Sequence, residues 1–493
     1  MANTQDNVAR LWALCHALRD DGITYHQYVT ELTYLLFLKM AAETGAADVQ
    51  GGDGSSGPNI PSGCRWSDLI SQPPAERLDF YRAMLFRLGS KGSPRVRDIF
   101  RNAQTSISRS SNLSLVVDAI NTIDWYSSGR EGLGDAYEGI LDKHASEKKS
   151  GAGQYFTPRP LIDCMVALIQ PQVGEIIQDP AAGTGGFLVA ADRYVKNLAG
   201  RAAALTRSQQ AFQATKAFQG MELVPDTHRL GLMNLLLHGI ESDRYCRGDA
   251  LSPDIAQLDV PDVILTNPPF GAKKGGGNPT RTDLRFKTAN KQLSFLQHVY
   301  RALPVGGRAA VVVSDNVLFE DGAGREVRSE LMSLCRLHTI LKLPTGIFYA
   351  QGVKTNVLFL NRDSETNTEH VWIYDMRANS APIRKRRPLA REDFISFELA
   401  FGTDPHGRSP RTDQGESGRF RCFTRDEILA RGDDLSIAWL RDDTAASDSA
   451  SDPGELCAEI IAKLRAALDE MEELSDILDF PPGSDPLSQA SNK

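Results

Sequence analysis

The sequence predicts an α/β fold built on a largely parallel sheet, and three observations support this prediction. Short apolar runs alternate with segments of helical periodicity between about residues 151 and 395. Such alternation is typical of a mostly parallel sheet with helices on both faces. Polar and glycine-rich motifs follow several of the apolar runs, and ligands bind at the carboxyl ends of strands in sheets of this kind. The 493 residues allow for about two to four domains.

Residues 1–130 are expected to form a helical N-terminal domain. Apolar residues recur at helical spacing from Leu11 to Leu18, and a second apolar stretch covers 32–40. The stretch 51–63 is rich in Gly, Ser and Pro, which indicates a loop or an insertion.

The central region, residues 131–395, carries the expected sheet. Its apolar runs and turn residues predict strands at 175–178, 217–221, 244–247, 262–266, 308–314, 338–343 and 355–360, with 371–375 as an extension.

A glycine-rich turn follows the first expected strand. The segment 179–186 reads DPAAGTGG and leads into an expected helix over 188–198. Gly183, Gly185 and Gly186 can adopt positive φ and let a ligand approach the backbone, and a helix start favours negative charge. The segment is neither the dinucleotide fingerprint G-x-G-x-x-G nor a P-loop, which weakens a nicotinamide reading and leaves an ATPase without support.

Acidic residues end two neighbouring strands. Glu222 follows the second strand, where an acid can bind a ribose diol, and Asp249 follows the third, where it can bind an adenine ring. Each acid alone is most simply a loop carboxylate. Their order after the glycine-rich turn is hard to explain by packing.

The tetrapeptide Asn267-Pro268-Pro269-Phe270 follows the fourth expected strand. The prolines fix φ and lack N–H groups, so the loop is stiff and rich in acceptors. An amide oxygen and a neighbouring carbonyl can accept both hydrogens of a planar amino group, and Phe270 offers a face for a heteroaromatic ring. Alone, the motif is equally well read as a turn beside a core Phe.

Together these motifs resemble the S-adenosyl-L-methionine-dependent methyltransferases that modify adenine N6 in DNA. The segment 151–160, GAGQYFTPRP, is similar to the cofactor-binding stretch of the modification (M, HsdM) subunits of type I restriction-modification systems. Segments 137–141, 316–319, 343–348 and 351–356 also resemble that family, densely over about 130–365. The family has a Rossmann-like, mostly parallel seven-stranded sheet whose last strand is antiparallel.

The resemblance also implies roles for individual residues. Asn267, Pro268, Pro269 and Phe270 would be catalytic. The cofactor-binding residues would be Gln154, Tyr155, Phe156, Thr157, Pro158, Arg159, Asp179, Ala181, Gly183, Thr184, Gly185, Gly186, Glu222 and Asp249. A long spacer, 199–213, separates the glycine-rich turn from Glu222.

Two basic stretches could contact nucleic acid. The segment 271–293, directly after the Asn267 motif, contains six cations against one acid, Asp283. We expect phosphate contacts from Lys273, Lys274, Arg281, Arg285, Lys287 and Lys291. The second stretch, 384–387, is either solvated or contacts phosphate, and the sequence does not choose between these roles.

The C-terminal region, 396–493, is polar and turn-rich apart from an apolar seam within 455–479. Its members repeat every three or four residues: Cys457, Ile460, Leu464, Ala467, Met471, Leu474 and Leu478. Such a helix commonly packs on its own protein. The family resemblance favours a helix that docks on helices of the specificity (S) subunit.

Three other functions compete with adenine methylation. Protein glutamine N-methyltransferases also use Asn-Pro-Pro and an aromatic residue, but the length, the basic segment and 151–160 argue against that class. Cytosine-N4 methyltransferases present a similar amino group, although their usual motif begins with Ser. A catalytically silent assembly subunit is the third, and the intact motifs argue against it.

Composition indicates a reduced, cytoplasmic enzyme. The seven cysteines include no C-x-x-C pair and the nine histidines show no zinc spacing, so we expect no structural disulfide and no metal. No signal peptide or membrane span is expected. The net charge of −8 argues against strong general DNA binding by this chain alone. The resemblance implies several partners: double-stranded DNA, an S subunit, a second M subunit and, where the system restricts DNA, restriction (R) subunits.

Overall fold

The computed structural model describes residues 9–15, 18, 22–43, 60–123, 134, 137–143, 156–202, 205–271, 279–348, 353–364, 367–378 and 389–440. The chain divides into two compact units. The first unit comprises Met1–Ala152, Gly183–Gly185 and Val224–Arg247. The second unit comprises Gly153–Ala182, Gly186–Leu223 and Gly248–Lys493.

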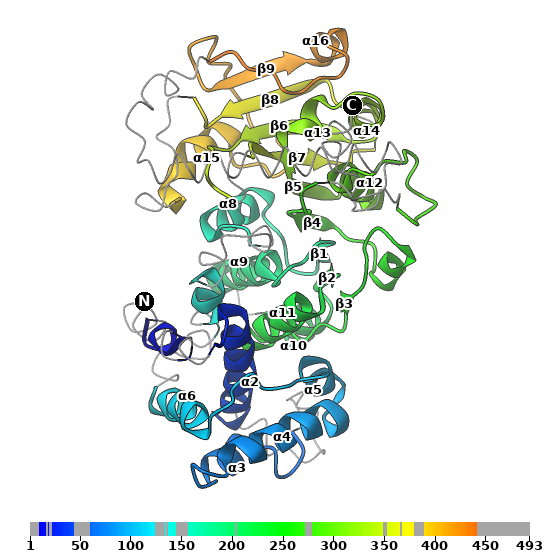
Figure 1. Cartoon of the computed structure of the whole chain (residues 1–493). Helices are drawn as coiled ribbons and strands as arrows, with labels where there is room; N and C mark the ends of the chain where they lie inside the picture. Colours follow the sequence, from blue (N-terminus) through cyan, green and yellow to red (C-terminus); the bar gives the residue numbers. More distant parts are fainter. Residues whose placement is uncertain are drawn as a thin grey trace, which may run out of the picture. The chain divides into compact units, whose positions relative to one another are not determined.

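The first unit is mainly helical, as the N-terminal sequence predicts (Figure 1). Its helices include α2 (Tyr25–Glu43), α3 (Trp66–Ile70), α4 (Arg77–Lys91), α5 (Pro94–Ile99), α6 (Ser110–Thr122) and α11 (Pro225–Leu237), and it also contains β3 (Tyr245–Arg247). Helix α2 is buried on almost every side from Tyr28 to Ala41, so it forms the centre of this unit. The apolar stretch 32–40 therefore marks a core helix.

Glu31 places a carboxylate within this helical core, where it is 1% exposed. Glu31 accepts a hydrogen bond from the Tyr81 hydroxyl at 3.0 Å and another from the Ser106 N–H at 2.5 Å. Burial raises the pKa of Glu31 to about 7, although these bonds oppose the rise.

A nine-stranded sheet has the strand order β3-β2-β1-β4-β5-β7-β6-β8-β9. The other strands are β1 (Ile177–Asp179), β2 (Phe218–Glu222), β4 (Val263–Thr266), β5 (Arg308–Ser314), β6 (Arg336–Lys342), β7 (Thr355–Asn361), β8 (His370–Asp375) and β9 (Phe420–Thr424). Every strand expected from the sequence is present within one or two residues.

Pairing is parallel from β2 through β1 and β4 to β5. Strand β7 then lies antiparallel between β5 and β6, and all seven of its residues are buried. This confirms the family prediction that the last of the seven core strands is antiparallel.

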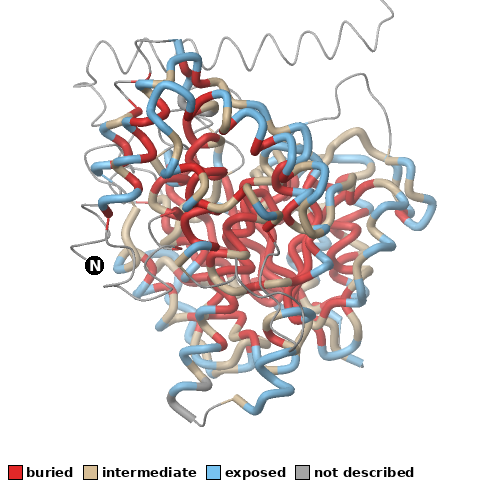
Figure 2. The backbone as a smooth tube through the Cα atoms, turned by 90° about the horizontal axis from the view of Figure 1, so that it is seen from below, coloured by how far each residue is buried: buried red, intermediate tan, exposed pale blue. Residues whose placement is uncertain are grey.

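The strands of this sheet are largely buried, and buried residues are red in Figure 2. Helices cover both faces of the sheet. They are α8 (Arg159–Ile169), α9 (Gly186–Ala202), α10 (Arg207–Thr215), α12 (Lys291–Ala302), α13 (Asp315–Phe319), α14 (Ala323–Leu334), α15 (Ile395–Phe401) and α16 (Arg425–Ala430). In β7, Leu358 and Leu360 join the core formed with α12 and α14. Phe359 points to the other face, where its ring packs against Phe397 and Phe401 of α15.

The sheet extends beyond residue 395, where its expected domain ended. Strand β9 pairs antiparallel with β8 over five residue pairs, and Trp372 packs on Phe420 with ring centroids 4.8 Å apart. The strand lies just after a polar, turn-rich stretch and has only five residues, so its sequence gave little periodic signal. The seam within 455–479 and the basic stretch 384–387 lie outside the described residues.

We predict that Phe359→Ala lowers the free energy of unfolding by about 3–5 kcal/mol, because it leaves a cavity in the aromatic cluster under α15. Thermal or denaturant unfolding monitored by circular dichroism would measure the loss. The control is Leu399→Ala in α15, the helix that covers this cluster. The Leu399 side chain is 79% exposed, so this substitution should change the free energy of unfolding by less than about 0.5 kcal/mol. Equal effects of the two substitutions would contradict this packing.

Candidate active site at the carboxyl ends of the parallel strands

The central parallel strands bring two of the predicted motifs together. Strands β1 and β4 are neighbours, so Asp179 at the end of β1 lies beside Thr266 at the end of β4. The Thr266 hydroxyl donates to Asp179 Oδ1 at 2.7 Å, and the Ala181 N–H donates to the same oxygen at 3.0 Å. Asn267, the next residue, therefore starts its loop next to the start of the glycine-rich turn.

Asp179 is only 2% exposed. Burial raises its pKa to about 7, the two hydrogen bonds oppose this rise, and the nearby charge of Glu222 adds to it. A carboxyl group that titrates near neutrality at the end of a central strand is a common feature of functional sites.

Glu222 and Asp249 also lie at this edge of the sheet. Glu222 ends β2, is 7% exposed, and its carbonyl accepts from the Gly248 N–H at 3.1 Å. Asp249 follows directly, and its Oδ1 accepts from the Leu251 N–H at 2.9 Å. The two acids predicted to bind a ribose and an adenine ring thus end neighbouring segments of the second unit.

Two of the three glycines of the glycine-rich turn have the predicted positive φ, whereas Gly186 does not and begins α9. Within the first unit, Gly183 and Gly185 have φ of 56° and 76°. The Gly183 carbonyl accepts from the Tyr245 hydroxyl at 2.6 Å, and the Thr184 carbonyl accepts from Asn234 Nδ2 at 2.9 Å. In the second unit, a side chain at Gly186 would come within 3.1 Å of Arg159 Nη1, so only glycine fits there without a shift.

The Asn267 motif contains a buried acceptor that has no partner among the described residues. Asn267 Nδ2 donates to Thr157 Oγ1 at 3.0 Å, while Asn267 Oδ1 is buried and makes no hydrogen bond. Phe270 packs edge-on against Phe348, with ring centroids 5.7 Å apart. A buried amide oxygen without a donor is costly unless a ligand supplies one.

The segment before α8 lies close to this motif. Thr157 contacts Asn267, Pro158 is the residue before α8, and Arg159 is its first residue. Phe156 is half-buried and precedes them. Gln154 and Tyr155 lie outside the described residues.

Comparison with known proteins identifies the family. The sequence model of the protein family described as N-6 DNA Methylase matches residues 128–448. The chain belongs to the N-6 DNA methylase family. Its residues 7–120 also match the HsdM N-terminal domain.

Similar proteins include type I methylase subunits. The StySPI methylase subunit of Salmonella potsdam is 46% identical over 515 residues, covering 96% of this chain and 95% of that protein. The crystal structure of the EcoKI M protein shows 41% identity and a TM-score of 0.56 over 98% of each chain. A chain from a structure on assembly and conformational transition of the type I R-M system shows 28% identity and a TM-score of 0.72, over 95% and 97% of the two chains.

These findings confirm the main prediction from sequence. The chain is an adenine-N6 DNA methyltransferase of the type I modification-subunit class, and S-adenosyl-L-methionine is its methyl donor. The comparisons do not favour glutamine or cytosine methylation, or a silent assembly role.

The basic segment of the methylase is only partly available for DNA. The Arg281 side chain is only 7% exposed and contacts Asp283, the Ala250 carbonyl and His298. Burial, with the Arg281 charge second, lowers the pKa of His298 to about 3, so this imidazole is neutral. Arg285 pairs with Glu330 at 3.2 Å but remains 68% exposed, Lys287 is exposed, and Lys291 is half-buried. Lys273 and Lys274 lie outside the described residues.

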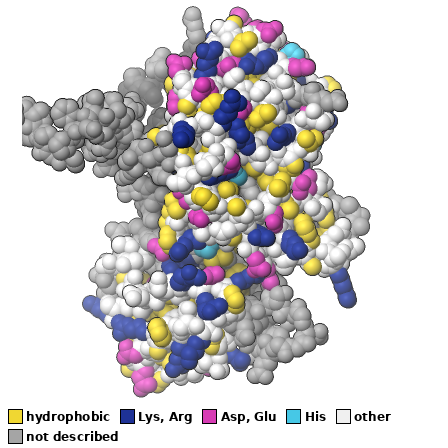
Figure 3. Space-filling view, turned by 90° about the vertical axis from the view of Figure 1, so that its right-hand side faces the viewer, with side chains coloured by type: hydrophobic (Ala, Val, Ile, Leu, Met, Phe, Trp, Pro, Cys, Tyr) yellow, Lys and Arg dark blue, Asp and Glu magenta, His cyan; other side chains and the backbone are white. Residues whose placement is uncertain are grey.

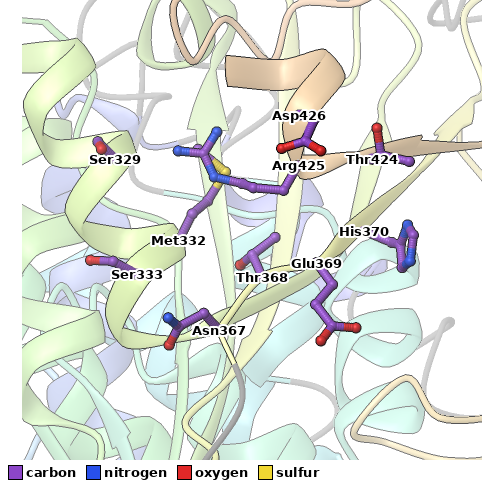
Figure 4. Close-up of a pocket in the computed structure, with 10 residues that line it drawn as sticks. All are labelled: Ser329, Met332, Ser333, Asn367, Thr368, Glu369, His370, Thr424, Arg425 and Asp426. Atoms are coloured by element: carbon purple, nitrogen blue, oxygen red, sulfur yellow. The ribbon is translucent and has the colours of Figure 1, made fainter. Parts of the chain in front are cut away.

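An open pocket of about 570 Å³ lies elsewhere in the second unit (Figure 4). Its lining comes from α14, the segment before β8 and the start of α16. The pocket lies where β8 begins, at His370, and where β9 ends, at Thr424, and none of its lining residues belongs to a predicted motif. Arg425 in this pocket pairs with Asp433 at 2.6 Å. We assign no role in methyl transfer to the pocket.

Sequence reasoning missed the residues that support the motifs. Four side chains donate hydrogen bonds to atoms of the predicted motifs. They belong to Thr266, Gln292, Asn234 and Tyr245. Only Thr266 carried a signal, because it stands directly before the Asn267 motif. In the described part of the chain, no helix has the length and apolarity needed to cross a membrane, and no cluster of three or more His, Cys, Asp or Glu could hold a metal.

We predict that Asp179→Asn changes how stability depends on pH. The pKa of Asp179 is raised from its ordinary 3.8 to about 7, so its contribution to stability is complete below about 4 and is lost as pH rises to about 7. Asn accepts the same hydrogen bonds without ionising. The variant should therefore gain stability relative to the wild type between pH 4 and 7, by at most about 1.4 kcal/mol per pH unit.

Denaturant unfolding across that pH range would measure the free energy of unfolding of both proteins. Subtracting the wild-type value from that of the variant cancels the contributions of groups that titrate equally in both. The exposed Asp426→Asn serves as the control. Parallel stability curves for the wild type and Asp179→Asn would contradict the raised pKa.

Proposed function

We propose that the methylase transfers a methyl group to N6 of an adenine flipped out of double-stranded DNA, with Asn267, Pro268, Pro269 and Phe270 as the catalytic residues. The observation that carries this proposal is the buried, unpaired Oδ1 of Asn267. An amino group in a stacked base cannot reach the methyl donor, so the base must leave the helix.

The acceptors act on the adenine amino group directly. Asn267 Oδ1 would accept one N6 hydrogen and the Pro268 carbonyl the other, while the Phe270 ring stacks on the base. Two preorganised acceptors localise the nitrogen lone pair and stabilise the positive charge that develops on nitrogen during transfer. Positioning supplies most of the remaining acceleration, and no covalent nucleophile is needed.

The strand-end residues fit the cofactor. Glu222 and Asp249 offer carboxylates for ribose hydroxyls and an adenine amino group. The positive φ of Gly183 and Gly185 suits a backbone that approaches a ligand closely. The remaining sequence-predicted cofactor residues keep their proposed roles, except Thr157, which is considered below. When bound, S-adenosyl-L-methionine supplies a methyl group activated by the positive charge on sulfur.

DNA contact would come from basic residues near the catalytic loop. Arg285 and Lys287 are exposed and Lys291 is half-buried, so these three can reach phosphate, whereas the Arg281 side chain contacts Asp283 and His298. Lys273 and Lys274 are proposed as phosphate contacts from the sequence alone. Basic and acidic side chains are interspersed on the face in Figure 3. A mixed surface and a net charge of −8 favour binding to a specific site through partners over strong general DNA binding.

The proposed complex contains an S subunit that reads the DNA sequence, a second M subunit and, where restriction occurs, R subunits. The similarity to type I methylase subunits over nearly the whole chain supports this assembly. The seam within 455–479 is our proposed docking segment for the S subunit, on the basis of its sequence pattern.

Asn267→Ala should abolish most methyl transfer and leave cofactor binding intact. Loss of one preorganised acceptor costs on the order of 3 kcal/mol of activation free energy, or about 100-fold in rate. Two measurements test this prediction. Transfer of a labelled methyl group to DNA whose adenines are unmethylated gives the rate, and calorimetry gives the affinity for the cofactor. Asn367→Ala, an exposed change in the same unit, is the control. Wild-type turnover by Asn267→Ala at equal cofactor affinity would refute the role of Asn267.

The pair Leu464→Asp and Leu474→Asp should disrupt assembly with the S subunit. Each unpaired carboxylate placed in an apolar interface costs several kcal/mol. Size-exclusion chromatography of co-expressed subunits would report assembly, and calorimetry would show cofactor binding unchanged. A complex of normal size and stability formed by the folded double variant would show that the seam packs elsewhere.

A further inference from the structure

The two acceptors proposed for the adenine amino group are each held by a side chain distant in sequence. Thr157 contacts the amide of Asn267, and Gln292 contacts the carbonyl of Pro268. Neither contact is local, because the partners are 110 and 24 residues apart. Both pairs lie in the second unit, at the end of β4.

In this structure Thr157 accepts from the nitrogen end of the Asn267 amide and leaves the oxygen end for a substrate. A carboxamide has one acceptor end and one donor end, and rotation by half a turn exchanges them. Asn267 Nδ2 is engaged by Thr157 Oγ1 at 3.0 Å, so Oδ1 takes the other, buried position. The reversed amide would present N–H groups to the N–H groups of an adenine, which repels the substrate.

Gln292 is oriented in the same way. Its Oε1 accepts from the Ser314 N–H at 3.1 Å, so its Nε2 faces the Pro268 carbonyl at 3.5 Å. The side chain is 1% exposed, which leaves it little freedom to rotate. The carbonyl has a second lone pair, and this one remains for an N6 hydrogen.

The first turn of α12 fastens the loop at a second point. Asn290 caps this helix by accepting from the Gln292 N–H at 3.0 Å. The Lys291 N–H donates to the Gly271 carbonyl at 3.3 Å, directly after Phe270. The catalytic loop is therefore attached to α12 at Pro268 and at Gly271, on either side of its aromatic residue.

We propose that Thr157 and Gln292 are positioning residues that orient the Asn267 amide and the Pro268 carbonyl for the amino group of the substrate. This inference rests on the proposed function of the Asn267 motif. It gives Thr157 a role different from the cofactor contact that the family resemblance implies.

The decisive comparison is between Thr157→Val and Thr157→Ser in the complex with the S subunit. Valine has nearly the shape of threonine without the hydroxyl, whereas serine keeps it. Thr157→Val should lower the single-turnover rate at saturating cofactor by about 10- to 100-fold, and Thr157→Ser should restore most of it. Cofactor affinity, measured by calorimetry, and the melting temperature should stay close to wild type in both variants.

A double-mutant cycle with Asn267→Ala separates positioning from an independent effect. If Thr157 acts through Asn267, adding Thr157→Val to Asn267→Ala should cause little further loss of rate. The inference would be overturned if the fold-losses in rate of the two single variants multiplied in the double variant. It would also be overturned if Thr157→Val bound the cofactor more weakly but kept the wild-type rate at saturating cofactor. If Asn267→Ala alone keeps the wild-type rate, the proposed function itself fails. If Asn267→Ala is inactive and Thr157→Val is normal, only the positioning role fails.

Gln292→Glu tests the second acceptor. The carboxylate still accepts from Ser314 but cannot donate to Pro268, so the rate should fall by about 3- to 30-fold at unchanged cofactor affinity. Gln292→Met removes both contacts and should lower the rate at least as much. A normal rate in folded Gln292→Glu would overturn the role of Gln292.

Discussion

The hydrogen bond from Thr266 to Asp179 joins the carboxyl ends of β1 and β4, and the geometry of the site depends on it. These two strands are neighbours inside the sheet, although Asp179 and Thr266 are 87 residues apart. The bond sets the start of the glycine-rich turn next to the start of the Asn267 loop. A parallel sheet makes this possible because its strands end at the same edge.

The site also depends on a balance between buried polar groups. Burial raises the pKa of Asp179, and Asn267 Oδ1 is buried without a hydrogen-bond donor among the described residues. Such groups persist where the surrounding structure holds them in place and a ligand completes them. Around Asn267, Thr157 and the first turn of α12 provide that support.

Much of this architecture could be predicted from the sequence. Buried parallel strands are continuous apolar runs, so β1, β2, β4 and β5 were recognisable, and their motifs follow them directly. Strand β9 was not recognisable, because it is short and lies in a polar region. The basic run around Arg281 predicts a phosphate contact, whereas its side chain is only 7% exposed and contacts Asp283 and His298. Contacts such as Thr157 with Asn267 join distant segments and leave no local pattern.

The central claim is that Asn267 Oδ1 and the Pro268 carbonyl accept the two hydrogens of a flipped adenine. A structure of the complex with its DNA site and a non-reactive cofactor analogue tests it most directly. We predict N6 of the extrahelical adenine within about 3 Å of both oxygens, with Thr157 still bound to Asn267 Nδ2. A stacked target base, or an extrahelical adenine whose N6 contacts neither oxygen, would contradict the account.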